Sequence, residues 1–169
     1  MLLNSVCPNS LNKELTRILL AEIAKSINAK EVFSLIGTDA GFVSKLPKSI
    51  KVVSAETNKN IFKFQKEKFS SYELHFCPAQ NVLFKSFQRF DIIWLDLLGP
   101  LSAESNLPSI TAARMSVKEG GFVAITSGTR RGKGVRGDYE TFIKNRGFNI
   151  MQKISYLNDG TRMKFYLCT

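Results

Sequence analysis

Two strand-like runs in the first half of this chain end in residues that could bind a nucleoside. The run Glu31 to Ile36 passes into a small-residue loop, and Glu56 closes the run Ile50 to Ala55. The loop consists of Gly37, Thr38, Asp39, Ala40 and Gly41, and Thr57 follows the acid. Glycines let the backbone approach a ligand, and an acid about twenty residues further on can accept hydrogen bonds from both ribose hydroxyls. Loop and acid together predict a nucleoside pocket, whereas a glycine pair alone is equally typical of a tight turn.

A carboxylate follows the most apolar run of the chain. Phe90 to Leu95 is almost entirely apolar, which is typical of a central parallel strand buried on both faces. Asp96 follows it directly and precedes Gly99 and Pro100. Asp96 is therefore the candidate catalytic residue, and the alternative is that its carboxylate only caps the loop. We expect Trp94 to pack in the core rather than to stack on a base.

Four cations lie close together after a fifth strand-like run, Phe122 to Thr126. They are Arg130, Arg131, Lys133 and Arg136, within a glycine-rich segment. The whole chain has a formal net charge of +10, which attracts polyanions. A phosphate backbone could dock on this basic loop. The competing interpretation is a loop whose charges are merely solvated.

The composition excludes several classes of protein. The 169 residues suffice for one domain with its own core, and no apolar stretch approaches the roughly 20 residues of a membrane span. Three scattered cysteines and a lone histidine, His75, favour free thiols and a structural imidazole, so we expect no metal site. Because Met1 to Leu11 lacks the features of a secretory signal, we expect a cytoplasmic protein.

Strands and helices alternate along the chain and would position these groups. The helices are expected at 12–27, 58–69, 79–87, 109–117 and 139–145, and the strands at 31–36, 50–55, 72–77, 90–95, 122–126, 148–156 and 163–168. Alternation predicts parallel strands with right-handed crossovers, and the Asp159-Gly160 pair near the end favours a hairpin. The sequence thus predicts a single α/β domain over residues 1–169, with an N-terminal helical segment at 1–30. Its architecture should be a three-layer α/β/α sandwich around a mostly parallel seven-stranded Rossmann-like sheet with a C-terminal antiparallel hairpin.

From Glu31 to Cys168 the order and spacing of these features resemble the class I S-adenosylmethionine-dependent methyltransferases. The resemblance implies that Gly37 to Gly41 and Glu56 bind the cofactor S-adenosylmethionine, the acid through its ribose. It also implies that Pro78, Ala79 and Gln80 meet the adenine and that Asp96 ends the fourth family strand. Thr57 and Asp96 are therefore expected to bind the cofactor as well. Asp96 to Gly99 is similar to the Asp-x-x-Gly motif of some RNA guanine methyltransferases, in which the acid engages the amino group being methylated.

Two positions depart from the family pattern. Leu35 stands where the family has an acid before the first loop glycine, and Asp39 replaces the middle glycine. Asp39 either supplies the missing carboxylate or weakens the site. The resemblance and the net charge together predict a methyltransferase that acts on nucleic acid, RNA before DNA. The alternatives are an enzyme of this fold acting on a small molecule, and a non-catalytic module that binds nucleic acid or another partner.

Overall fold

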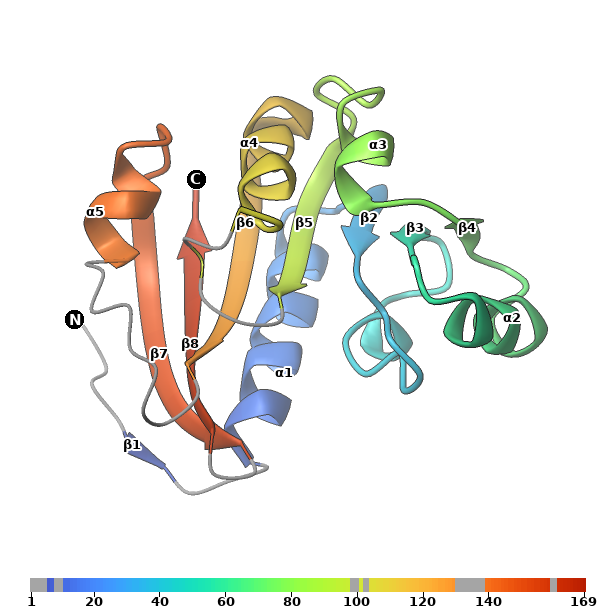
Figure 1. The fold of residues 1–169 in the computed structure, drawn as a ribbon, viewed down its shortest axis with the longest axis horizontal. Coiled ribbons are helices and arrows are strands. Elements are labelled where there is room, and N and C mark those ends of the chain that lie inside the picture. The colour runs from blue at the N-terminus through green and yellow to red at the C-terminus, as the bar shows by residue number, and fades with distance from the viewer. Residues whose placement is uncertain (1–5, 8–10, 98–100, 102–103, 130–138, 159–160) are drawn as a thin grey trace.

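The middle layer of the structure is a β-sheet (Figure 1). Its strands span Val6–Cys7 (β1), Glu31–Ser34 (β2), Lys51–Ala55 (β3), Glu73–His75 (β4), Phe90–Leu97 (β5), Val117–Thr129 (β6), Ile150–Asn158 (β7) and Thr161–Cys168 (β8). Among the described residues these eight strands lie in the order β1-β7-β8-β6-β5-β2-β3-β4. This computed structural model describes the whole chain except residues 1–5, 8–10, 98–100, 102–103, 130–138 and 159–160.

The strand directions confirm the predicted architecture. From β4 to β6 every neighbouring pair is parallel, and β8 runs antiparallel to both β6 and β7. The seven predicted strands correspond to β2 through β8, whereas β1 was not predicted because a strand of two residues has no periodicity to detect. The chain order reverses at β2, which lies between β3 and β5. Open α/β sheets bind ligands beyond the carboxyl ends of their strands at such a point.

Helices cover both faces of the sheet. They span Leu11–Ser26 (α1), Lys59–Lys68 (α2), Ala79–Leu83 (α3), Leu107–Ser116 (α4) and Tyr139–Lys144 (α5), with a 3₁₀ turn at Val43–Lys45 (η1). Buried residues of α1 and of the η1 region form one apolar core with the sheet, and those of α3, α4 and α5 form a second core. The three-layer sandwich is therefore confirmed. Within the described segments, no helix is both long enough and apolar enough to cross a membrane.

The buried face of α1 differs from the predicted one. Hydropathy predicts a buried stripe of Leu15, Ile18, Leu19, Ile23 and Ile27. In the structure Leu15 and Ile18 are 47% and 43% exposed. The residues of α1 that are buried instead are Thr16, Leu20, Ala21 and Ala24. The small side chains Ala21 and Ala24 allow this helix to pack close to the sheet. Because alanine is only weakly hydrophobic, a hydropathy pattern does not identify it as the buried side.

Strand β6 begins at Val117, earlier than the predicted Phe122, because α4 passes into the strand without a loop. The β5–β6 register shifts between Phe90 and Ile92, where the added residues are accommodated. A Cβ atom on Gly121 would lie 2.7 Å from the Asp91 carbonyl oxygen, so only glycine allows this approach.

Candidate active site

The predicted cofactor-binding and catalytic residues lie at one edge of the sheet, here called the carboxyl edge, where β2, β3, β4 and β5 end. Ser34 pairs with Trp94 in the β2–β5 ladder, and the Leu35 amide donates to the Trp94 carbonyl at 3.3 Å. The loop after β2 and the end of β5 are therefore neighbours. Glu56 follows β3 directly and donates its amide to the His75 carbonyl of β4 at 3.0 Å.

The glycine loop is held between helices α2 and α1. Gly37 has a φ of +54°, and no atom lies within 4 Å of the place where a Cβ would be, so the backbone there is open to a ligand. The buried amide of Gln65, in α2, donates to the Gly37 carbonyl at 2.7 Å. Thr38 is exposed, and Ala40 has the unusual φ of +48° for a residue with a side chain.

The Arg17 side chain of α1 packs directly on this loop. Its guanidinium lies where a side chain of residue 41 would begin, so a larger residue at position 41 would displace the Arg17 guanidinium from the loop. Arg17 also pairs with Asp39, whose other carboxylate oxygen accepts from the Gly41 amide at 3.1 Å. Burial raises the pKa of Asp39, but the hydrogen bonds from Gly41 and Arg17 outweigh it and lower the pKa below its usual value. A carboxylate is therefore present on the loop, although Leu35 replaces the family acid.

The Glu56 carboxylate is fixed in place by backbone amides. One of its oxygens accepts from the Thr57 amide at 2.8 Å and the Asn58 amide at 2.7 Å. Asn58 in turn caps α2 through its side-chain oxygen. The acid is thus pre-oriented at the end of β3, and Thr57 is exposed beside it.

Asp96 lies at the end of β5 with its side chain 25% exposed. Its carboxylate forms an ion pair with the Lys13 ammonium of α1, with an N–O distance of 3.2 Å. Trp94, two residues earlier, is buried in the core, donates to the Thr126 hydroxyl at 2.9 Å and packs edge-on against Phe42. Asp96 shares with Trp94 the face of the sheet that α1 covers.

The sequence prediction missed three polar residues of this site. They are Lys13 and Arg17 of α1 and Tyr156 of β7. The Tyr156 hydroxyl and the Arg17 Nε are both buried with no hydrogen-bond partner among the described residues. Burial, then the nearby charge of Asp96, raises the pKa of Tyr156 well above its usual value. Lys13 and Arg17 do lie four residues apart on one helix face, but that spacing does not reveal which way the face points.

The predicted adenine segment lies at the start of α3. Pro78 is the N-terminal capping residue of this helix. Ala79 packs partly buried against the core, and the Gln80 side-chain oxygen accepts from the Ser109 hydroxyl at 3.1 Å. The predicted phosphate-binding residues Arg130, Arg131, Lys133 and Arg136 fall outside the described residues.

His75, Cys77 and Cys168 have surroundings typical of structural residues. The His75 Nε2 lies 2.8 Å from a Glu73 oxygen, which supports the structural interpretation. Cys77 and Cys168 are free thiols, and burial raises the pKa of Cys168 to about 12. No group of three or more potential metal ligands occurs in the part of the chain that the structure describes.

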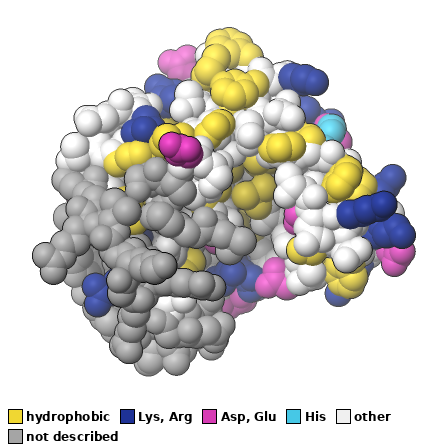
Figure 2. Space-filling view, viewed as in Figure 1, with side chains coloured by type: hydrophobic (Ala, Val, Ile, Leu, Met, Phe, Trp, Pro, Cys, Tyr) yellow, Lys and Arg dark blue, Asp and Glu magenta, His cyan; other side chains and the backbone are white. Residues whose placement is uncertain are grey.

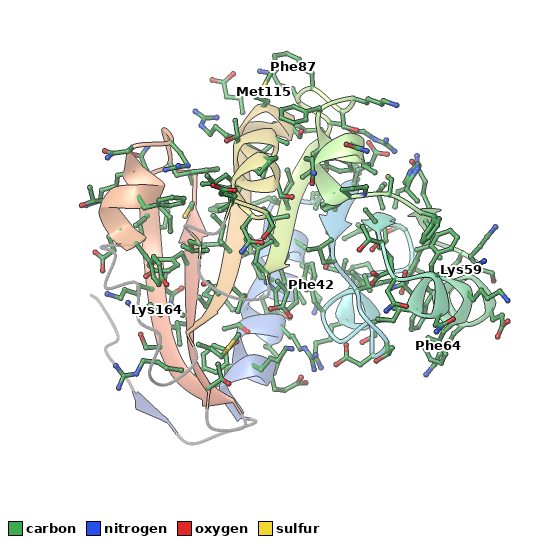
Figure 3. All side chains as sticks on the ribbon, viewed as in Figure 1. Phe42, Lys59, Phe64, Phe87, Met115 and Lys164 are labelled. Carbon is green, nitrogen blue, oxygen red and sulfur yellow. The ribbon has the colours of Figure 1, made fainter. Side chains whose placement is uncertain are left out.

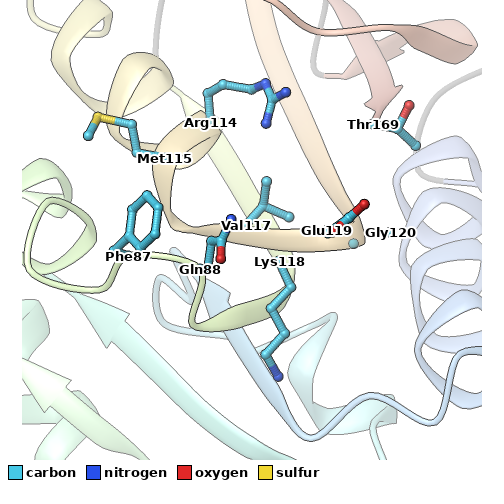
Figure 4. A pocket seen from close by; sticks show the side chains of 10 residues that line it. Phe87, Gln88, Arg114, Met115, Val117, Lys118, Glu119, Gly120 and Thr169 are labelled. Atoms are coloured by element: carbon cyan, nitrogen blue, oxygen red, sulfur yellow. The ribbon is translucent and has the colours of Figure 1, made fainter.

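A hollow of about 350 Å³ lies at the opposite edge of the sheet, where β5 and β6 begin (Figure 4). Phe87, Arg114, Met115, Lys118 and Glu119 are among its lining residues. Because the predicted cofactor residues follow the other ends of the strands, this hollow is separate from the site described above.

No protein-family model and no curated protein sequence matches this chain. Solved structures do resemble it. An S-adenosylmethionine-dependent methyltransferase from Clostridium acetobutylicum ATCC 824 matches with a TM-score of 0.68 and 14% identity, over 90% of this chain and 89% of that chain.

Two further structures share this similarity. The Burkholderia thailandensis 1,6-didemethyltoxoflavin-N1-methyltransferase, with bound 1,6-didemethyltoxoflavin and S-adenosylhomocysteine, has a TM-score of 0.65 and 11% identity, over 94% of this chain and 79% of that chain. Precorrin 8w decarboxylase from Methanobacterium thermoautotrophicum has a TM-score of 0.62 and 15% identity, over 99% and 96% of the two chains. At these identities the likeness concerns the fold. The chain has the Rossmann-like fold of the class I S-adenosylmethionine-dependent methyltransferases.

Proposed function

We propose that this protein transfers a methyl group from S-adenosylmethionine to a nucleic acid, RNA before DNA. The observation that carries the proposal is the set of oriented charges at the carboxyl edge of the sheet, together with buried polar atoms that lack partners there. Such unsatisfied groups are costly within a protein alone and are explained if a polar ligand completes them.

The residues present fit this cofactor at both of its polar ends. Glu56 is oriented by two backbone amides and suits the ribose hydroxyls. The cationic Arg17 and Lys13 suit the carboxylate of the methionine part, and Asp39 suits its ammonium group. The unpartnered Arg17 Nε and Tyr156 hydroxyl add two donors near the same place.

When bound, the cofactor supplies a methyl group already activated on a sulfonium. The chain then has to orient the acceptor, exclude water and receive a proton where the acceptor is an amino group. Asp96 suits the first and the third of these tasks, because its carboxylate lies at the end of β5 and can accept a hydrogen bond, and then a proton, from an amino group. The ion pair with the Lys13 ammonium holds the Asp96 carboxylate in one orientation at the carboxyl edge.

A nucleic acid acceptor is favoured by charge. The net charge of +10 attracts a polyanion, and the sequence places the cations Arg130, Arg131, Lys133 and Arg136 shortly after the last residue of β6. The second candidate for the methyl acceptor is a small heterocyclic molecule, because the Burkholderia structure contains bound 1,6-didemethyltoxoflavin.

The test is transfer of a labelled methyl group from S-adenosylmethionine to total RNA, to single-stranded DNA and to a mixture of small metabolites. We expect label in RNA, and we expect its amount to fall as ionic strength rises, since phosphate contacts are screened by salt. Label only in the metabolite fraction would overturn the acceptor. Absence of label in every fraction would overturn the activity.

A further inference from the structure

Helix α2 presents lysines and aromatic rings together on the outside of the molecule. The surface named here the α2 surface consists of Phe62, Lys63, Phe64, Lys66, Lys68 and Phe76. Figure 3 labels Lys59 and Phe64 on this helix, and Figure 2 shows Lys and Arg side chains around hydrophobic ones on the same side of the molecule. Phe64 is 38% exposed and Phe76 is 54% exposed, whereas Gln65 is the buried residue of the helix.

The aromatic rings of the α2 surface are held in place. Phe62 and Phe76 pack with their ring centroids 5.2 Å apart, which joins α2 to the segment after β4. The Lys66 ammonium lies 5.8 Å from the Phe62 ring centroid, and the Lys68 ammonium lies 5.2 Å from that of Phe64. Rings already ordered in this way lose little conformational entropy when another flat group stacks on them.

The charge of α2 is not neutralised by neighbouring acids. The helix carries four lysines and one acid, Glu67. None of these lysines forms an ion pair with a carboxylate in the described part of the chain. The nearest strand, β4, does contain Glu73, but its carboxylate is engaged by Lys51, Arg89 and His75. The surface therefore offers free positive charge beside exposed rings.

The α2 surface is continuous with the candidate active site. Helix α2 begins at Lys59, shortly after Glu56, and its Gln65 side chain donates to the Gly37 carbonyl. At the other end, only Cys77 separates Phe76 from the predicted adenine segment, Pro78 to Gln80. A chain bound along this surface thus reaches the carboxyl edge.

We propose that the α2 surface binds single-stranded nucleic acid and guides it toward the carboxyl edge. Unpaired bases expose flat faces that stack on aromatic side chains, while lysines follow the phosphates. A duplex hides those faces, and an acidic protein partner offers no series of flat rings. The step from docking to methylation rests on the proposed function, but the binding itself does not.

The test is fluorescence anisotropy with a labelled single-stranded RNA of about 12 nucleotides, a length comparable to the sites of other proteins that bind single strands by stacking. The same RNA as a duplex and vesicles of anionic lipid are the comparison ligands. We expect Phe76→Ala to weaken single-strand binding roughly ten-fold, because one stacking platform is lost. The double variant Lys63→Gln/Lys66→Gln should reduce the slope of log affinity against log salt by about 1.4.

The matched control is Phe87→Ala, which removes an exposed ring at the opposite edge and should leave RNA affinity unchanged. All substituted side chains are at least partly exposed, and unchanged thermal unfolding would show that each variant folds. Equal affinity for single strand and duplex would overturn the inference, as would variants that bind like the parent. Binding to vesicles alone, lost in the lysine variant, would overturn it in favour of a membrane surface.

Cofactor binding measured on the same samples separates the two proposals. Single-strand binding through the α2 surface without any S-adenosylmethionine binding would refute the proposed enzyme and leave this surface intact. RNA methylation with unaltered affinity in the Phe76 and lysine variants would refute the surface alone.

Discussion

Both edges of the sheet are rich in charged side chains, but the edges differ in how completely their polar groups are paired. At the edge where the strands begin, here called the amino edge, the carboxylates of Glu31, Glu73 and Asp91 each have several hydrogen-bonding or ionic partners. Asp91 accepts from the Lys30 amide at 2.7 Å, the Glu31 amide at 2.8 Å and the Lys118 ammonium at 2.8 Å. At the carboxyl edge, two buried donors have no partner among the described residues. A saturated network stabilises the fold, whereas an unsaturated one is suited to a ligand.

The amino-edge network extends across three neighbouring strands. Arg89 and Lys51 each pair with both Glu31 and Glu73. The hydrogen bond from Lys51, followed by those from Arg89 and His75, lowers the pKa of Glu73 from 4.5 to about 2. These residues begin β2, β3 and β4, so the network fixes the start of the parallel strands that end at the candidate active site.

The largest expected difference between the edges concerns turnover. Asp96→Asn should lower kcat roughly 100-fold or more, because a positioned acid–base group is lost. Cofactor affinity should change only slightly, since the residue is assigned to the acceptor. Steady-state kinetics with RNA measures both. Glu119→Gln at the amino edge is the matched control, and equal losses of turnover and of cofactor affinity in Asp96→Asn would contradict the catalytic role.

The next largest effect concerns cofactor affinity. Arg17→Ala should raise the Kd for S-adenosylmethionine roughly 10- to 100-fold, because a charged hydrogen bond to the ligand is removed. Lys25→Ala, near the other end of the same helix, should leave the Kd unchanged since Lys25 pairs only with Glu22 in the described residues. A normal Kd in the Arg17 variant would remove this residue from the site.

A smaller effect is expected at the amino edge, on stability alone. Glu73→Gln should lower the free energy of unfolding at neutral pH by roughly 1 kcal/mol, because the pairs are partly exposed. Since the folded pKa of about 2 is below the usual 4.5, this contribution is present above pH 4.5 and is lost as the pH falls toward 2. Chemical unfolding at several pH values measures it. A difference between parent and variant that grows on acidification would contradict the assignment.

The smallest effect is expected for Tyr156→Phe. Its hydroxyl has no partner in the described chain, so its removal should leave stability unchanged or slightly higher. If the hydroxyl instead donates to the cofactor, the Kd should rise about three-fold. Thermal unfolding with and without S-adenosylhomocysteine separates the two contributions. A large loss of stability without ligand would reveal a structural partner.

The fold could be predicted from the sequence because its signals are local and repeated. The apolar run at 90–95, the small loop after β2 and the acid after β3 each mark a strand end, and their order defines the sheet. Helix α1 shows where this approach fails. Its buried side depends on how closely two alanines approach the sheet, which is a tertiary property.

The site was predicted only in part for the same reason. Glu56 and Asp96 were found because strand ends converge at one edge. Lys13, Arg17 and Tyr156 come from a helix before the first central strand and from the strand pair at the end of the chain. Only the folded sheet brings these distant segments to Asp39 and Asp96, so no spacing in the sequence reveals them.

Calorimetric titration with S-adenosylmethionine tests the role of the carboxyl edge most directly. We expect saturable binding, with a Kd in the micromolar range that Glu56→Ala weakens roughly ten-fold and that Glu67→Ala, on the outside of α2, does not change. No binding at about 1 mM cofactor, or equal affinity in the Glu56 variant and the parent, would contradict a cofactor site at this edge.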